Sequence, residues 1–372
     1  MLKPTPKVAH LTSAHPRYDT RIFIKMCSSL AAQGYAVSLV VADGKSDEVK
    51  HGVSIVDVGA KTGGRLSRMT KIVKRVFEKA KELDADIYHL HDPELIPVGL
   101  KLRKLGKTVF FDAHEDFPKQ LLGKPYLNKL SKLVLSKIFE YYERYVCPSF
   151  DAIVTATPFI REKFLMMNPN TLVINNYPLL DELANTCDWA QKDNEVAYVG
   201  GIAKIRGIEE LIAAMDFTQG VRLNLAGIFS EIAVEEKVKN CPGWSQVTHL
   251  GFVNRQKVNE LLAKSKAGLV TFLPSPNHID AQPNKMFEYM SAGLPIITSN
   301  FTLWREIVEG NECGLCVDPM DPKAIGGAIQ YLIDHPAEAD QMGKNGRQAV
   351  EKKYNWLIEE QKLLKLYKEF SG

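Results

Sequence analysis

The sequence predicts an α/β protein of two domains, each built on a doubly wound parallel sheet. The chain has 372 residues, which is more than one hydrophobic core usually supports. Short apolar runs rich in β-branched residues alternate with helical patterns along most of the chain, as in a parallel sheet with crossover helices. The alternation restarts after a turn at residues 175–178, so we place a domain boundary there.

Five apolar runs predict the strands of the N-terminal half, and helical segments separate them. They lie at residues 7–12, 36–42, 87–90, 108–111 and 152–155. The first helix is predicted to run from a Thr20 cap to Gly34, with apolar residues along one face. The run at 36–42 is continuous, which is typical of a strand buried on both faces.

The C-terminal half repeats this pattern. Its predicted strands lie at residues 195–199, 221–226, 247–250, 267–271 and 294–298, with a helix at 208–215. We predict an N-terminal domain at 1–178, a C-terminal domain at 179–354, and a helix at 355–372 that packs back toward the first domain. The cleft between two such domains is the expected ligand site.

Composition indicates a protein that does not cross a membrane. Hydrophobic residues make up 45% and charged residues 24%, as in soluble globular proteins. There is no run of about 18 apolar residues and no secretory signal at the N-terminus, so we expect a cytoplasmic location. Of the six cysteines only Cys313 and Cys316 form a CxxC pair, which does not complete a zinc site, and we expect reduced thiols.

Positive charge gathers in the N-terminal half. Residues 1–180 hold 27 Lys+Arg and 18 Asp+Glu, and the remainder holds 20 and 26. Basic segments at 65–83 and 119–145 also carry apolar residues at helical spacing, and such helices can lie on anionic bilayers. A core-facing stripe with a solvated basic back is the alternative. We expect peripheral contact with the inner face of an anionic membrane, and no nucleic-acid partner because no recognition motif accompanies the lysines.

A glycine-rich turn follows the first strand of the C-terminal half. Gly200 and Gly201 let the backbone approach a ligand closely, and the following helix start favours anions. Arg206 adds a fork of donors that suits phosphate oxygens. The strict GxGxxG spacing is absent, which argues against a nicotinamide enzyme. A packing turn with a surface arginine remains an alternative.

Two carboxylates, Asp280 and Glu288, frame a second candidate segment. Pro283 stands near the start of a helix and Lys285 falls in its first turns. An ionised carboxylate accepts two hydroxyl bonds at once, so one could bind sugar hydroxyls and the other a ribose diol. The spacing alone fits equally well a surface aspartate and a helix glutamate paired with a basic neighbour.

In the N-terminal half, polar clusters stand where strands end, which is where open α/β sheets bind ligands. Histidine titrates near neutrality and bonds hydroxyls, and a carboxylate can position an acceptor hydroxyl. The loop after the first strand could contact acceptor or diphosphate, although a capped helix start with a buried Arg21 fits it too. The acceptor candidates from these segments are His15, Arg17, His91, Asp92 and Glu115, with His114 beside them.

The sequence resembles the retaining glycosyltransferases of family GT4, whose GT-B fold has two Rossmann-like domains facing across a cleft. The match runs through essentially the whole chain and is strongest between Tyr198 and Val317. Asp280 and Glu288 align with the family's E-x7-E signature, and the typical run from Glu288 to Pro295 follows.

The resemblance implies roles for single residues. Glu288 would bind the donor ribose, Asp280 would contact the donor sugar, and His114 would lie against that sugar. The loop Gly251-Phe252-Val253 resembles the one whose backbone holds the nucleobase of a UDP- or GDP-linked donor.

Two departures from the family pattern stand in this chain. The first acidic position is Asp280 rather than a glutamate. The family's phosphate pair is an arginine directly after the glycine and a lysine further on, whereas here Gly201 takes the first place and Arg206 the second. Lys285 or Lys204 would replace the missing cation, and we favour Lys285 because it lies within the signature.

The resemblance implies sugar transfer with retention to a glycan or polyprenyl-linked acceptor, in the synthesis of O-antigen, capsule or exopolysaccharide. In the implied front-side substitution the leaving diphosphate takes the acceptor proton, while Arg206 and Lys285 stabilise charge and His114 and Asp280 hold the sugar. We identify no Asp-x-Asp metal motif, and we expect no metal. The alternatives are a sugar-nucleotide epimerase of the same fold and a non-catalytic nucleotide-sugar-binding subunit.

Overall fold

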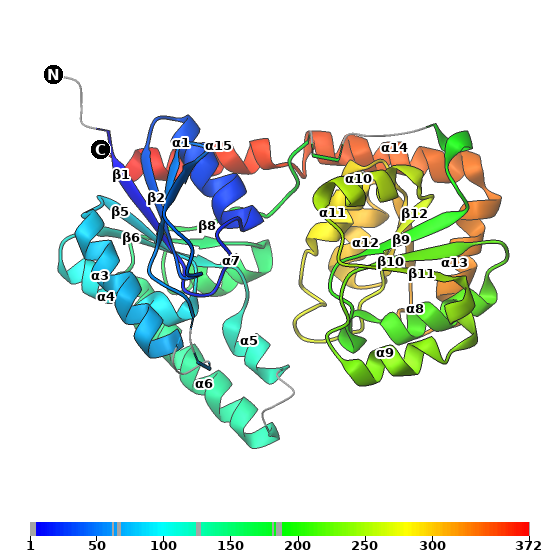
Figure 1. Ribbon diagram of the computed structural model, residues 1–372, viewed down its shortest axis with the longest axis horizontal. Coiled ribbons are helices and arrows are strands. Elements are labelled where there is room, and N and C mark those ends of the chain that lie inside the picture. Colours follow the sequence, from blue (N-terminus) through cyan, green and yellow to red (C-terminus); the bar gives the residue numbers. More distant parts are fainter. Residues whose placement is uncertain are drawn as a thin grey trace. The chain divides into compact units, whose positions relative to one another are not determined.

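The computed structural model describes residues 5–61, 63–64, 68–123, 128–180, 182–183 and 188–371 (Figure 1). The chain forms two compact units. Unit 1 comprises Met1–Asn176 and Leu357–Gly372, and unit 2 comprises Tyr177–Trp356. The chain thus changes unit close to residue 178, and its last helix belongs mostly to unit 1.

Unit 1 contains an eight-stranded sheet in the order β3-β4-β2-β1-β5-β6-β7-β8. All neighbours are parallel except β3 and β4. The short strands β3, β4 and β8 were not predicted from the sequence. The strands are β1 (Lys7–Leu11), β2 (Ala36–Val41), β3 (Glu48–Lys50), β4 (Val53–Asp57), β5 (Ile87–Leu90), β6 (Thr108–Ala113), β7 (Ala152–Thr155) and β8 (Thr171–Val173).

The first helix of unit 1 begins differently from the prediction. The Asp19 carboxylate, not the Thr20 side chain, accepts hydrogen bonds from the amides of Arg21 and Ile22, so the predicted Thr20 cap is wrong. The helix opens with wide π-type turns and ends at Ala32. The helical segments of unit 1 are η1 (Thr20–Cys27), α1 (Ser28–Ala32), η2 (Arg68–Ile72), α3 (Val73–Leu83), η3 (Pro93–Leu95), α4 (Ile96–Lys104), α5 (Phe117–Leu122), α6 (Lys129–Val146), η4 (Cys147–Ser149), α7 (Pro158–Leu165) and α15 (Trp356–Phe370).

Unit 2 contains a six-stranded parallel sheet in the order β11-β10-β9-β12-β13-β14. Its strands are β9 (Glu195–Val199), β10 (Arg222–Ala226), β11 (Val247–Gly251), β12 (Ala267–Val270), β13 (Ile296–Ser299) and β14 (Gly314–Val317). Its helical segments are η5 (Trp189–Gln191), η6 (Lys204–Arg206), α8 (Ile208–Ala214), η7 (Met215–Phe217), α9 (Ile232–Lys239), η8 (Pro242–Gln246), α10 (Arg255–Lys264), α11 (Asn284–Ser291), α12 (Thr302–Val308), α13 (Pro322–Asp334) and α14 (Pro336–Lys352). Ala197 packs into one apolar cluster and its neighbours Val196 and Tyr198 into another, so β9 is covered on both faces.

The two basic segments fold differently. In α3 and the turn before it, Ile72, Val76 and Ala80 are buried, which matches the alternative of a core-facing stripe. Helix α6 instead leaves a row of large apolar side chains exposed, at Leu130, Leu133, Val134, Leu135, Ile138, Tyr141 and Tyr145. Residues 65–67 and 124–127 of these segments lie outside the described residues. Among the residues that are described, no helix combines the length and apolar character needed to span a bilayer.

Candidate functional site

In unit 2, two cations converge on the glycine turn that follows β9. Gly200 has a φ of +123°, and a Cβ on it would stand 3.3 Å from Lys285 Nζ. A Cβ on Gly201 would stand 3.2 Å from Arg206 Nη1. Any side chain at either position would therefore crowd the two cations, and the glycines leave this space open.

Lys285 is an unusual cation because it is buried. It lies in the first turn of α11, and its Nζ stands 3.6 Å from the centroid of the Tyr198 ring. No hydrogen-bond partner for this amine occurs in the described part of the chain. Burial, reinforced by the nearby Arg206, holds the pKa of Lys285 well below its usual value. A bound anion would supply the missing hydrogen bonds and favour the charged amine.

Arg206 is held over the same turn by the backbone. Its Nη1 donates to the carbonyl oxygen of Gly201 at 3.1 Å, and the Tyr198 hydroxyl donates to the same oxygen at 2.9 Å. Lys204 is exposed and lies 3.9 Å from a Glu209 oxygen. Of the two lysines considered as substitutes for the missing arginine, Lys285 is the one beside the glycines.

Glu288 has a partner that the sequence analysis did not identify. Its Oε1 accepts from Arg255 Nη2 at 2.8 Å, and Arg255 Nε also donates to Glu182 at 2.5 Å. Pro283 is the N-cap of α11, as the helix prediction required, and Asp280 lies partly exposed before it. The ribose and sugar contacts assigned to Glu288 and Asp280 stay predictions.

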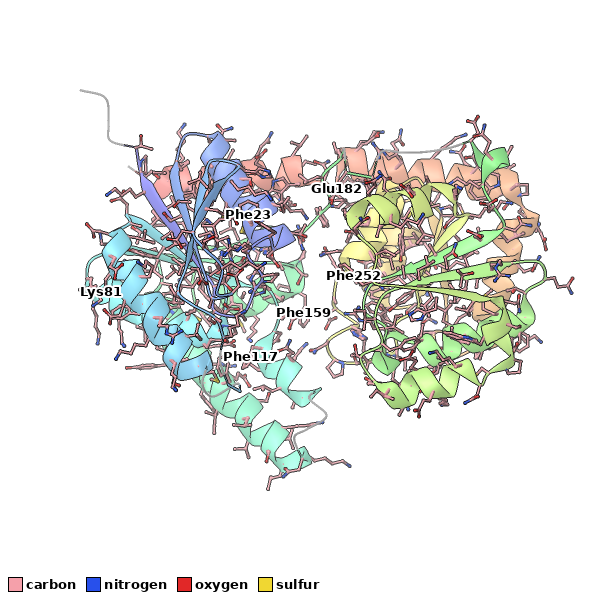
Figure 2. The ribbon with its side chains drawn as sticks, in the orientation of Figure 1. Phe23, Lys81, Phe117, Phe159, Glu182 and Phe252 are labelled. Atoms are coloured by element: carbon pink, nitrogen blue, oxygen red, sulfur yellow. The ribbon has the colours of Figure 1, made fainter. Side chains whose placement is uncertain are left out.

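The loop predicted to hold a nucleobase leaves β11 with an exposed aromatic ring. Gly251 has a φ of +63°, and its carbonyl oxygen accepts from the Gly227 amide at 2.8 Å. Phe252 is 81% exposed, which is unusual for phenylalanine, and it is labelled in Figure 2. Val253 packs against the apolar cluster of unit 2. The anchored glycine and valine thus hold an open ring on the surface, where a planar base could stack.

In unit 1, Asp112 and Arg21 form a buried pair next to His114. The guanidinium donates to both carboxylate oxygens, at 2.8 and 3.0 Å, and also to the carbonyl oxygen of Ile174. Burial alone would raise the pKa of Asp112, but Arg21 and the neighbouring imidazoles hold it well below its usual value. His114 Nδ1 lies 3.5 Å from Asp112 Oδ2.

His114 itself is poised as a neutral ring. Burial lowers its pKa to about 4 despite the nearby Asp112. Its Nε2 is buried and has no hydrogen-bond partner among the described residues. The ring therefore has one nitrogen directed at a carboxylate and one that is unused.

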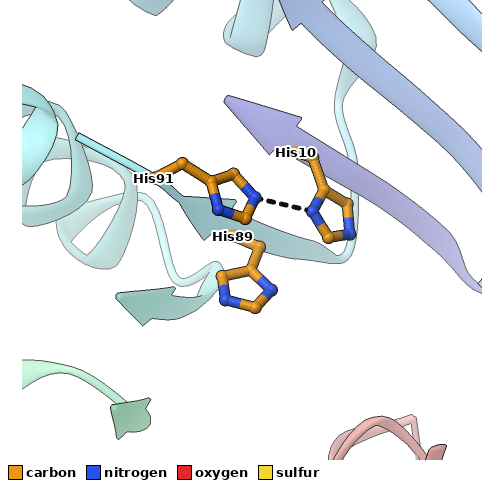
Figure 3. Close-up of side chains that lie close together, drawn as sticks. All are labelled: His10, His89 and His91. Atoms are coloured by element: carbon orange, nitrogen blue, oxygen red, sulfur yellow. Dashed lines mark hydrogen bonds between the residues drawn. The ribbon is translucent and has the colours of Figure 1, made fainter. Parts of the chain in front are cut away.

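His91, predicted to bind the acceptor, has both ring nitrogens engaged inside the protein. Nδ1 lies 3.1 Å from Asp112 Oδ2. Nε2 lies 2.8 Å from His10 Nδ1, and the dashed line in Figure 3 marks this contact. His89 and Tyr367 extend this cluster: the Tyr367 hydroxyl lies 2.8 Å from His89 Nδ1 and 3.2 Å from His10 Nε2. In this structure His91 supports neighbouring side chains, and its contact with an acceptor stays a prediction.

Asp92 is likewise committed to its own loop. It accepts hydrogen bonds from the Thr12 hydroxyl at 2.8 Å and the Ser13 amide at 2.6 Å. Its other oxygen lies 3.0 Å from His15 Nδ1. Burial alone would lower the pKa of His15, but Asp92 raises it. The His15 ring stands 5.2 Å from that of His114, so these two acceptor candidates lie side by side.

Arg17 and Glu115 stand apart from this cluster in their contacts. The buried Arg17 guanidinium donates to Asp43 at 2.7 Å and to Glu48 at 2.6 Å. Glu115 is exposed and accepts from the Gln120 amide. Neither contact brings the side chain to His114, and their acceptor roles remain untested predictions.

Two groups among the described residues have the ligand types of a metal site. They are His10, His89 and His91, and His91, Asp112 and His114, with ligand atoms within 4.8 Å of one another. An Asp-x-Asp spacing also occurs at Asp84 and Asp86, outside the donor segments. There Asp84 pairs with Lys107 at 2.6 Å and Asp86 accepts from the Lys7 amide at 2.8 Å.

Sequence reasoning missed His10, His89, Asp112, Tyr367 and Arg255. The first three had a signal, because they are polar residues at alternate positions within otherwise apolar strands. Each of the other two joins its partner from a distant helix, α15 or α10, so no local pattern indicated it.

Known proteins match both units. Residues 20–175 match a family model described as glycosyltransferase family 4, and residues 181–349 match one described as glycosyl transferases group 1. The capsular polysaccharide biosynthesis glycosyltransferase CapM of Staphylococcus aureus is 28% identical over 47% of this chain. The match covers 46% of the length of CapM, about half of that protein. The D-rhamnosyltransferase WbpZ of Pseudomonas aeruginosa is 24% identical over 77% of this chain and 72% of its own length.

Solved structures share the architecture of the whole chain. Sucrose-phosphate synthase of Thermosynechococcus elongatus superposes with a TM-score of 0.79 at 19% identity, covering 98% of both chains. HepE of Anabaena in complex with UDP-glucose gives a TM-score of 0.73 at 13% identity, covering 98% of this chain and 99% of its own. Because the two family models together match most of the chain and the fold agrees with these structures, the chain belongs to the GT4 family of glycosyltransferases and has their GT-B fold.

Proposed function

We propose that this protein transfers a sugar from a nucleotide-sugar donor to a glycan or polyprenyl-linked acceptor, with retention of the anomeric configuration. One observation carries the proposal. The buried amine of Lys285 has no hydrogen-bond partner in the described structure and stands with Arg206 over an open glycine turn. Two cations beside accessible backbone suit a diphosphate, and a buried amine gains most from that ligand.

The remaining donor contacts follow from this placement. Phe252 offers an exposed ring for a base, and Glu288 offers a carboxylate for the ribose diol once it shares or releases Arg255. HepE was solved with UDP-glucose, which supports a nucleotide-sugar donor; we propose UDP- or GDP-linked sugars for this chain. Asp280 and His114 would hold the sugar hydroxyls.

For the chemistry we propose a front-side substitution that needs no metal. The acceptor oxygen bonds to the anomeric carbon as the bond to the diphosphate breaks, and the leaving diphosphate oxygen takes the acceptor proton. Arg206 and Lys285 stabilise the charge that develops on the diphosphate, which is the task a divalent ion performs in other transferases.

We further propose that the acceptor is presented at a membrane. The exposed apolar residues of α6 recur at spacings of three and four, through Leu130, Val134, Ile138, Tyr141 and Tyr145, and so form one stripe. Lys129, Lys132 and Lys137 lie on the same helix. An apolar stripe with lysines matches an anionic bilayer in both chemistry and charge. The relatives CapM and WbpZ, named for capsule synthesis and rhamnosyl transfer, support a place in bacterial surface polysaccharide synthesis.

A panel of UDP- and GDP-sugars, each with and without polyprenyl-phosphate and polyprenyl-diphosphate-sugar acceptors, tests the function. A glycosylated lipid whose anomeric configuration equals that of the donor is the expected product. A free isomerised nucleotide sugar would replace the proposal with an epimerase, and saturable binding without turnover would replace it with a binding subunit. An inverted linkage would overturn the front-side mechanism.

A further inference from the structure

The polar cluster in unit 1 arises from the register of three neighbouring strands. In β1, β5 and β6, His10 stands opposite His89, and His89 stands opposite Phe110. His91 and Asp112 follow two residues further along and share the same face of the sheet, while Ala9, Leu11, Tyr88, Leu90 and Phe111 pack into the apolar cluster on the other face. The clustering is therefore a consequence of strand alternation.

The donor and the acceptor of each hydrogen bond in this cluster follow from the charge of Asp112. An ionised Asp112 can only accept, so His91 Nδ1 at 3.1 Å must donate to it. A His91 ring that carries only this proton has an accepting Nε2, to which His10 Nδ1 donates a hydrogen bond at 2.8 Å. By the same logic His10 Nε2 accepts from the Tyr367 hydroxyl at 3.2 Å.

The last link agrees with this direction. Because the Tyr367 hydroxyl donates its hydrogen bond to His10, its oxygen accepts one from His89 Nδ1 at 2.8 Å. His89 Nε2 is then a bare lone pair, and it is the ring nitrogen of His89 that has no partner among the described residues. Burial holds the pKa values of His10 and His89 well below 6.5, in keeping with neutral rings that carry one proton each.

The same donor and acceptor argument applies to His114, which also faces Asp112. Its Nδ1 lies 3.5 Å from Asp112 Oδ2, and the negative charge of the carboxylate favours the proton on the ring nitrogen that faces it. The other nitrogen, Nε2, is then left with a lone pair. That atom is buried and has no hydrogen-bond partner in the described structure, which is unfavourable for a polar atom. Burial, reinforced by Arg21, His91 and His15 around the ring, lowers the pKa of His114 and keeps the ring neutral. A hydrogen-bond donor, which a sugar hydroxyl can supply, is the partner that this atom lacks.

We propose that Asp112 is a positioning residue that fixes His114 in the Nδ1–H tautomer, so that Nε2 accepts a hydrogen bond from a sugar hydroxyl. The chain Tyr367–His10–His91, together with Arg21, holds Asp112 in place. The inference rests on the proposed sugar transfer, because the hydroxyl is taken to belong to the donor or acceptor.

The same histidines could instead hold a metal ion, but two distances favour the hydrogen-bond chain. His10 Nδ1 and His91 Nε2 are 2.8 Å apart. Two nitrogens at about 2.0–2.1 Å from a tetrahedral zinc would be about 3.4 Å apart. Asp112 already pairs with Arg21 at 2.8 Å, so a second cation there would meet a compensated charge.

The full chain with ¹⁵N-labelled histidine tests the tautomers directly by NMR, without any sugar. We expect a proton on Nδ1 and none on Nε2 in both His114 and His91, and because burial lowers the pKa of His114 to about 4, its signals should not change between about pH 6 and 8. A proton on Nε2 of His114, or a stoichiometric bound metal in elemental analysis of the purified protein, would overturn the inference. Because no substrate enters, this result is independent of whether sugar transfer is found.

Three variants separate positioning from packing. Asp112→Asn keeps the shape but can donate to imidazole, so the His114 proton should move to Nε2 and kcat should fall about 10- to 100-fold. Tyr367→Phe should shift the His10 signals and lower kcat by less. Tyr88→Phe is the matched control, because it removes a buried hydroxyl from the other face of β5. Equal effects of Tyr367→Phe and Tyr88→Phe would contradict the proposed hydrogen-bond chain from Tyr367 to Asp112. An Asp112→Asn protein with unchanged His114 signals would also contradict it. If Asp112→Asn does not fold, the wild-type tautomers and the Tyr pair decide.

Discussion

The amine of Lys285 stands 3.6 Å over the centroid of the Tyr198 ring, beside the glycine turn and without a hydrogen bond to any described residue. A cation–π contact compensates only part of the loss of water around a buried amine. The protein therefore holds a buried amine whose charged form would be stabilised by an anion that binds at the turn.

Lys285→Met should stabilise the ligand-free protein and impair the enzyme. Removing a buried amine without a hydrogen-bond partner should raise the free energy of unfolding by about 1–3 kcal/mol. Losing a charged contact to the diphosphate should lower kcat/KM about 10- to 100-fold. Urea denaturation and steady-state kinetics measure the two effects.

Lys264→Met, an exposed change at the end of α10, is the control and should alter neither the stability nor the kinetics. A Lys285→Met enzyme with normal kinetics would remove this residue from the donor site.

Glu288→Ala and Arg206→Ala should each abolish most activity and leave the fold intact. Both side chains are only partly buried, and the Arg255 partner of Glu288 keeps its bond to Glu182. The cost in stability should therefore stay below about 1 kcal/mol. Kinetics, together with thermal unfolding with and without nucleoside diphosphate, checks this. Near-normal turnover in either variant would contradict the assigned site.

Asp280→Glu tests the departure from the family signature. The longer side chain restores the usual glutamate and extends the carboxylate by one methylene. Restored or higher activity with the same donor would indicate ordinary family geometry. A change in the preferred nucleotide sugar would indicate that the shorter side chain sets donor specificity. Competition between donors in a single reaction reads out the preference.

Glu143 should make stability fall as the pH rises toward neutrality. Burial raises its pKa from 4.5 to about 7, although Lys163 lies 2.6 Å away. A folded-state pKa above the unfolded one means that the stabilising contribution is complete below about pH 4.5 and is lost through pH 7. Relative to wild type, Glu143→Gln should gain about 3 kcal/mol between these values. Urea titrations across this range measure the change, and exposed Glu162→Gln should follow wild type throughout.

The stripe on α6 should control binding to vesicles. A Leu130→Gln, Ile138→Gln double variant removes two exposed apolar side chains, each worth about 1.5–3 kcal/mol when buried in lipid. In co-sedimentation with phosphatidylcholine vesicles that contain phosphatidylglycerol, we expect the double variant to bind at least tenfold more weakly than wild type. Its thermal stability should be unchanged. Leu105→Gln, an exposed change elsewhere in unit 1, is the control. Equal binding by all three proteins would exclude this surface.

Much of the fold could be predicted because strand and helix periodicities are local. The predicted bounds of β5, β7 and β9, which are short and mostly apolar, agree with the structure. The strands β3, β4, β8 and β14 were not predicted, because β3 and β8 have only three residues each and because polar residues in β4 and a glycine in β14 interrupt the apolar pattern. The Thr20 cap was assigned one residue too late because Asp19 and Thr20 are both good caps and only the folded backbone selects between them.

By itself, the sequence determined the glycine turn, the signature helix and the polar strand ends, because each is a short motif with its own local chemistry. Only the tertiary structure decided that Lys285 rather than Lys204 stands beside the glycines and that Arg255 holds Glu288. It also decided that Asp112 gathers His91, His114 and Arg21. Such contacts depend on strand register and on helices far away in the chain, and the burial that shifts these pKa values exists only once the sheets have packed.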